Sequence, residues 1–298
     1  MLLLILSTTT LAIGVRILVN PLSNVFQKYL TQRQSNPLLV VMITYALLSV
    51  GCVGYILIHP LPQLSADFWY NSLIFNLLAV TGNFFLVKSL QEGDLSVLGP
   101  INAYKSLVSL VFGIFLLGEI PNLWGIIGMI LIVSGSYFVL SQSGSSERFS
   151  WDIFQKKEVQ YRFLALIFSA IDALFLKKII LLTDANVAFV SWCVGGFIIS
   201  ILLLLLTARK LQLRLQLGVV RAYKWHFFAL AISTGLMQLS TNYAFEGIQV
   251  SYALALFQIS ALVSVLLGVH FFKETKLWRK LGGAAIMVAG AALIILFR

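Results

Sequence analysis

Long runs of apolar residues, separated by short polar connections, dominate this sequence. A helix needs roughly 20 such residues to cross the hydrocarbon core of a bilayer. The runs of sufficient length are Leu2–Pro21, Pro37–Ile58, Phe68–Leu90, Leu95–Leu117, Asn122–Leu140, Tyr161–Leu182, Asn186–Thr207, Trp225–Phe245, Val250–Phe271 and Leu277–Phe297. A helical continuation of the first run to Leu30 is an alternative. We expect all ten to be membrane-spanning helices, because an open strand edge in lipid would leave backbone hydrogen-bonding groups unpaired.

Two polar stretches interrupt this pattern. Ser141–Gln160 separates five spans from five, which predicts a first five-helix repeat (residues 1–141), a polar linker (142–160) and a second five-helix repeat (161–298). Lys210–Leu217 alternates apolar and polar residues with period two. A paired strand is one interpretation of that alternation, and an extended loop at the membrane interface is the one we prefer for so short a segment.

Part of the first half is repeated in the second half. At an offset of 155 residues, Gly93–Glu119 aligns without a gap with Ile248–Glu274, and further on Gly128 aligns with Gly283 and Gly135 with Gly290. A repeat with an odd number of spans must cross the membrane in the opposite direction the second time. The pattern therefore predicts an all-α polytopic membrane protein of two inverted repeats, an arrangement typical of alternating access.

Composition and charge agree with a membrane protein. Hydrophobic residues make up 59% of the chain, charged residues 11%, and the mean hydropathy is +0.94. Soluble domains carry about 25% charged residues, so this chain could not cover a water-facing surface. The net charge of +10 comes from basic residues in the connections, which indicates membrane topology and lipid headgroups, with no surface for nucleic acid.

The last two spans of each half carry a family resemblance. Gly118–Leu140 reads "GEIPNLWGIIGMILIVSGSYFVL", and its counterpart Lys273–Ile295 reads "KETKLWRKLGGAAIMVAGAALII". Together with the five-plus-five order, these segments resemble the EamA-type branch of the drug/metabolite transporter superfamily. The resemblance implies a secondary transporter with a central cavity, in a bacterial cytoplasmic membrane. Family members are usually drawn with both termini inside, whereas the positive-inside rule applied to these connections places both termini outside, so the orientation stays open.

Polar residues within the spans are candidates for the cavity, because an ionisable group in the bilayer costs at least about 2.5–3.5 kcal/mol. Arg16 begins a polar helical face, and Asn83 aligns with Gln238 between the repeats. Each could instead serve packing, through pairing or interhelical hydrogen bonds. The predicted substrate-binding residues are Arg16, Asn20, Asn83, Asn102, Lys105, Gln238 and Asn242.

Acidic residues in the spans have two interpretations. Asp172 either pairs with Lys105 or Arg16 to hold the halves together, or takes up and releases a proton as the cavity changes sides. Asp172 and Glu246 are the candidates for proton coupling.

These residues favour a secondary active transporter, not an enzyme, for a small polar or amphiphilic metabolite: an amino acid, an organic anion or a drug-like compound. One alternative is a flippase or transporter for a lipid-linked or phosphate-bearing substrate, with Arg16 and Lys105 as anion contacts. A membrane-embedded transferase is disfavoured, because no histidine–carboxylate constellation is present. The expected partners are the small-molecule substrate, the lipid bilayer, and a proton or another coupling ion. Nothing in the sequence indicates a cofactor, a metal site or an oligomeric state.

Overall fold

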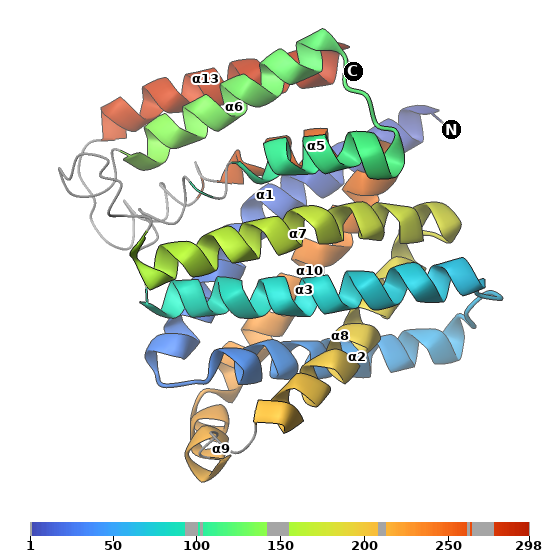
Figure 1. Cartoon of the computed structure of the whole chain (residues 1–298), viewed down its shortest axis with the longest axis vertical. Helices are drawn as coiled ribbons and strands as arrows, with labels where there is room; N and C mark the ends of the chain where they lie inside the picture. The colour runs from blue at the N-terminus through green and yellow to red at the C-terminus, as the bar shows by residue number, and fades with distance from the viewer. Residues whose placement is uncertain are drawn as a thin grey trace.

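The computed structural model describes residues 2–92, 101, 104–141, 155–207, 213–260, 263 and 277–297. This part of the chain is helical, with short turns between the helices (Figure 1). The helices are α1 (Leu2–Gln32), α2 (Pro37–Ile58), α3 (Ala66–Glu92), α5 (Lys105–Leu117), α6 (Leu123–Ser141), α7 (Lys157–Leu182), α8 (Ala185–Thr207), α9 (Leu213–Ala222), α10 (Lys224–Gly247), α11 (Val250–Phe257) and α13 (Leu277–Phe297).

Local sequence signals set the limits of several helices. The Asn36 side chain accepts hydrogen bonds from the backbone N–H groups of the first turn of α2, and proline follows it at the first helical position. Asp184 caps α8 in the same way, with its Oδ1 2.7 Å from the Asn186 nitrogen. Gly118 ends α5 in the left-handed conformation that glycine adopts without steric cost. The first span continues through Pro21 as helix α1, which ends at Gln32, two residues beyond the possible extension to Leu30.

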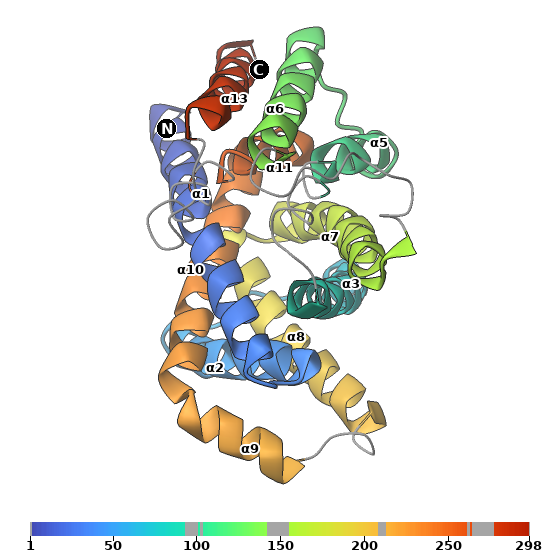
Figure 2. The same cartoon turned by 90° about the vertical axis from the view of Figure 1, so that its left-hand side faces the viewer.

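The helices of the two halves pack against one another. α3 packs on α7 and α1 on α10, while α2 packs on α8, α5 on α11 and α6 on α13. Figures 1 and 2 show α6 and α13 side by side at one end of the molecule. The hydrophobic core accordingly draws on both halves, with Tyr45 and Phe75 from the first and Trp192 and Phe245 from the second.

Glycines let α6 and α13 approach closely. A Cβ atom on Gly128 would lie 2.7 Å from the Gly290 oxygen, and one on Gly135 would lie 2.6 Å from the Gly283 oxygen. These pairings require the two helices to run in opposite directions. They are also reciprocal, since the sequence repeat equates Gly128 with Gly283 and Gly135 with Gly290.

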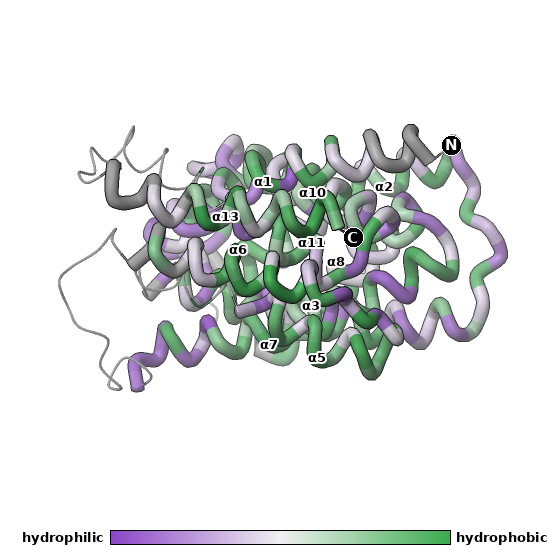
Figure 3. Tube along the Cα trace, turned by 90° about the horizontal axis from the view of Figure 1, so that it is seen from above, coloured by the Kyte–Doolittle hydropathy of each residue, from purple (hydrophilic) through white to green (hydrophobic). Residues whose placement is uncertain are grey.

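Hydrophobic residues occupy most of the length of the helices (Figure 3). Within the described residues, four helical segments are long and apolar enough to cross a membrane: Thr8–Gln32, Pro37–Ile58, Ala66–Gln91 and Ala185–Leu206. Lys105–Leu117, Leu123–Ser136 and Ala285–Phe297 are shorter apolar helices. The repeated stretches Gly93–Glu119 and Ile248–Glu274 lie partly outside the described residues.

The prediction of an extended loop over Lys210–Leu217 is wrong from Leu213 onward, where the chain forms α9. Tertiary hydrogen bonds hold this helix. The Gln216 side chain accepts from the Asn36 N–H at 2.9 Å and donates to the Gln34 oxygen at 2.9 Å, which fixes α9 beside the α1–α2 turn. At 10 residues α9 is too short to cross a bilayer.

Candidate functional site

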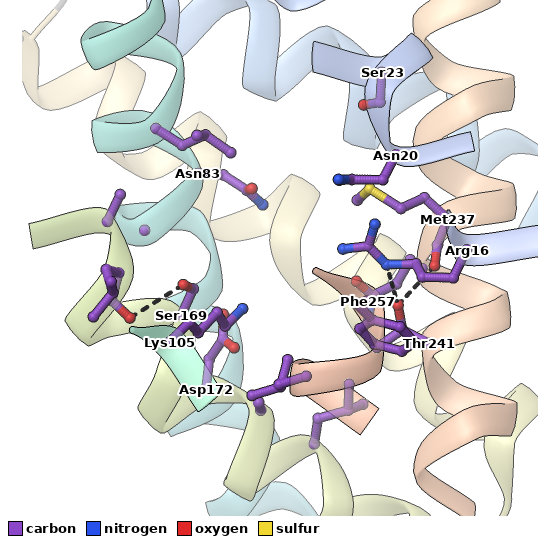
Figure 4. A pocket seen from close by; sticks show the side chains of 18 of the residues that line it. Arg16, Asn20, Ser23, Asn83, Lys105, Ser169, Asp172, Met237, Thr241 and Phe257 are labelled. Carbon is purple, nitrogen blue, oxygen red and sulfur yellow. Dashed lines mark hydrogen bonds between the residues drawn. The ribbon is translucent and has the colours of Figure 1, made fainter. Parts of the chain in front are cut away.

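A polar cavity lies in the interior of the helical bundle. Helices α1, α10 and α11 form one wall, and α3, α5 and α7 form the other (Figure 4). Its volume is about 130 Å³, roughly ten times what a single water molecule needs. Its polar lining residues are Arg16, Asn20, Ser23, Asn24, Gln27, Asn83, Lys105, Arg162, Ser169, Asp172, Gln238, Thr241 and Gln258.

Arg16 is the principal charged group on the first wall. Its Nε donates to the Thr241 hydroxyl at 2.8 Å, and its guanidinium carbon lies 5.0 Å from the centre of the Phe257 ring. Its Nη1 is buried and has no hydrogen-bond partner among the described residues. A buried donor without a partner is costly, so this nitrogen is suited to an acceptor on a bound molecule.

Lys105, Asp172 and Arg162 lie on the opposite wall. Lys105 begins α5, and its charge interacts with that of Asp172 on α7; Figure 4 shows the two side chains together. Arg162, near the start of α7, is only 8% exposed. The described lining therefore contains three cations and one carboxylate, and this excess of positive charge favours an anionic group in the cavity.

Neutral polar groups connect the cavity walls to the surrounding helices. The Asn20 amide donates to the Ser260 hydroxyl at 3.1 Å, and the Asn83 amide donates to the Tyr45 hydroxyl at 3.0 Å. Gln27 is buried, and its Oε1 has no partner within the described part of the chain. These groups can orient a polar molecule, because amides both donate and accept hydrogen bonds.

Most of the residues predicted to bind substrate lie together in this cavity. Arg16, Asn20, Asn83, Lys105 and Gln238 all line it, as does Asp172, the first proton-coupling candidate.

Two other predicted site residues, Asn242 and Glu246, do not line the cavity. Asn242 is buried behind the cavity, where its amide donates to the Ala185 oxygen at 2.9 Å and its Oδ1 accepts from Gln238 at 3.0 Å. Glu246 is exposed near the end of α10 and is not among the lining residues. Asn102 lies outside the described residues.

The sequence interpretation did not identify Arg162, Ser169, Thr241 and Gln258 as lining residues. Arg162 is the second residue of the predicted span Tyr161–Leu182 and closely follows the polar linker, where a basic residue is typical of a membrane-flanking position. A usable signal was present: Arg162, Ser169 and Asp172 are separated by seven and three residues, which places them on one helical face.

Apolar helices around a buried polar cavity indicate an integral membrane protein. The chain belongs to the EamA-like transporter family, whose model matches residues 18–141 and again residues 156–296. It is thus a membrane transporter of the drug/metabolite transporter type, and members of this family are transporters, not enzymes.

Similarity to a solved structure extends over nearly the whole chain. One protein known from its crystal structure superposes with a TM-score of 0.75 over 97% of both chains, at 16% sequence identity. At this level of identity the comparison shows a shared fold. No curated protein sequence matched the chain.

Proposed function

We propose that the protein is a secondary active transporter that carries a small organic anion or zwitterion through the central cavity by alternating access. The observation that carries this proposal is the charge of the cavity lining, which contains three cations and one carboxylate among the described residues. The acidic group of the substrate would bind at Arg16, whose Nη1 lacks a partner among the described residues. A carboxylate or a phosphate would satisfy such a site, because guanidinium groups bind both.

The packing of the helices supports inverted repeats. Under the sequence repeat, α1 corresponds to α7 and α3 to α10, so the contact of α3 with α7 corresponds to that of α10 with α1. The glycine pairs of α6 and α13 are exchanged in the same way, between helices of opposite direction. We therefore propose ten spans in two inverted five-helix repeats, residues 1–141 and 161–298, in a bacterial cytoplasmic membrane.

Substrate screening in proteoliposomes tests the function. Purified protein would be reconstituted, and uptake of labelled dicarboxylates, sugar phosphates, amino acids and organic cations would be measured. We expect saturable uptake of an anion or zwitterion. Transport of cations alone would overturn the assignment of the substrate class, and no transport of any class would count against a carrier for small metabolites.

Arg16→Ala tests the contact in the cavity. Loss of one charge-assisted hydrogen bond should lower kcat/KM for the anion by about 10- to 100-fold. Arg221→Ala is the matched control, because it removes the same charge from the exposed end of α9. Equal uptake by Arg16→Ala and the wild type would remove Arg16 from the site.

A further inference from the structure

A second cavity lies between α2, α3 and α8. Its volume is about 280 Å³, and the described lining contains no ionisable side chain. Trp69, Leu73 and Ile198 line it and are also largely exposed on the surface of the bundle, so the cavity reaches the face that would contact lipid. We call it the side cavity.

The side cavity and the central cavity are separated by the backbones of two helices. Phe75 and Trp192 line the central cavity, whereas their neighbours in sequence, Asn76 and Ser191, line the side cavity. Among the described residues the two cavities share no lining residue. The side cavity is therefore a separate site.

Asn76 gives this apolar cavity one specific polar group. The residue is 3% exposed, and its Nδ2 donates to the Ser72 backbone oxygen at 2.8 Å. This contact identifies the nitrogen, because only the NH2 group of the amide can donate to a carbonyl. The remaining atom, Oδ1, is buried and accepts no hydrogen bond from the described residues. In a membrane no water is at hand to supply the missing donor.

Gly195 makes room for the Asn76 side chain. A Cβ atom at position 195 would lie 2.4 Å from Asn76 Nδ2 and 3.0 Å from its Oδ1. Beside it, the Ser191 hydroxyl donates to the Ser72 hydroxyl at 3.0 Å. The packing of α3 on α8 thus leaves an unsatisfied acceptor on a residue that lines an apolar cavity.

We propose that the side cavity binds an uncharged amphiphile from the bilayer, with its apolar chain along the walls and a hydroxyl group donating to Asn76 Oδ1. The apolar lining excludes ions, since no charged group is available to replace their hydration. An acceptor without a donor selects an alcohol over an alkane of the same length. This site does not depend on the substrate of the central cavity.

Quenching of Trp69 fluorescence tests the proposal. Protein in lipid nanodiscs would be titrated with 8-bromo-1-octanol, 1-bromooctane and 1-bromo-8-methoxyoctane, and Trp69→Phe would identify the signal of this residue. We expect saturable quenching by the alcohol, with an affinity about five-fold above that of the alkane and of the ether. The ether retains the oxygen but cannot donate, so the comparison identifies the donor without any variant.

Two variants on α3 complete the test. Asn76→Leu should abolish the preference for the alcohol, whereas Asn71→Leu, the same change at a residue outside the cavity lining, should keep it. Equal quenching by all three compounds in the wild type would overturn the proposal. Retention of the preference in Asn76→Leu would overturn it as well, and if this variant does not fold, the ether comparison decides.

Discussion

Asp172 and Lys105 lie together on one wall of the cavity, where Asp172 has two possible roles, as the partner of an ion pair or as a proton carrier. If Asp172 takes up the coupling proton, Asp172→Asn should make uptake of the anion independent of pH, because an amide does not ionise. Initial rates in proteoliposomes at a series of pH values measure this. Asp184→Asn is the control, because Asp184 is an exposed turn carboxylate and asparagine is an equally good helix cap. An unchanged pH profile in Asp172→Asn would leave the ion pair as the role of this residue.

Glu119 lies in the turn between α5 and α6, where its carboxylate accepts a hydrogen bond from the Val250 N–H at 3.0 Å. Burial raises the pKa of Glu119 above its ordinary value of 4.5, against the opposing effects of this N–H and of the Lys177 charge. The folded protein therefore holds the Glu119 proton more tightly than the unfolded chain does. Its contribution to stability is complete below pH 4.5 and is lost as the pH rises through the raised pKa.

Glu119→Gln should remove this dependence, because the amide does not ionise and still accepts from Val250. As the pH rises from about 4 to about 7, the Tm of Glu119→Gln should increase relative to that of the wild type. Thermal unfolding in detergent at each pH measures it. A difference that stays constant over this range would show that ionisation of Glu119 does not affect stability.

At the level of single residues, the sequence identified those site residues whose polar or charged side chains are costly to place in lipid. Arg16 and Lys105 were predicted to bind substrate because a charge in an apolar span costs free energy, which a functional or structural contact must offset. Gln238 and Asn242 are one helical turn apart, so the sequence alone places both on the same helical face. Only the tertiary packing of α10 on α8 decides which of the two lines the cavity. That information is not contained in the spacing of a single helix.

At the scale of helices, apolar runs predicted the positions of the long helices well, because length and hydropathy are properties of the segment itself. Helix α9 was not predicted, since hydrogen bonds between Gln216 and a distant turn hold it. The alternation of apolar and polar residues over eight positions cannot predict a contact with a residue so distant in the sequence. The charged cavity residues Arg16, Lys105 and Asp172 align between the repeats with neutral Ala165, Ser260 and Ser23, so the repeat itself could not indicate them.

The crossing of α6 and α13 depends on glycine. Gly128→Ala should destabilise the protein by about 1–3 kcal/mol, because the new methyl group would collide with the backbone of α13. Gly51→Ala is the matched control: no atom lies within 4 Å of a Cβ there, so the change should be neutral or slightly stabilising. Thermal unfolding of both variants in the same detergent measures the difference. Equal Tm values would show that α6 and α13 do not approach each other closely in the membrane.

The direction of the two repeats is a property of the whole molecule, and the α1–α2 turn offers a direct test. The first spans of the two halves align at an offset of 149 residues, which pairs Asn24–Lys28 with Ala173–Lys177. At this offset Gln34 in the α1–α2 turn corresponds to Thr183 in the α7–α8 turn. Inverted repeats place these two turns on opposite sides of the membrane, whereas parallel repeats would place them on the same side. The hydrogen bonds from Gln216 bring α9 to the α1–α2 turn, so Arg221 on α9 should lie on the side of Gln34.

Single cysteines at positions 34, 183 and 221, in a background with Cys52 and Cys193 replaced by alanine, can be labelled with a membrane-impermeant maleimide. In cells and in inverted vesicles, Gln34→Cys and Arg221→Cys should react from one side and Thr183→Cys from the other. Reaction of Gln34→Cys and Thr183→Cys from the same side would contradict the inverted repeat. It would also remove the support that inversion of the two halves gives to alternating access. The side on which Gln34→Cys reacts would fix the orientation of the termini as well, which the distribution of basic residues leaves open.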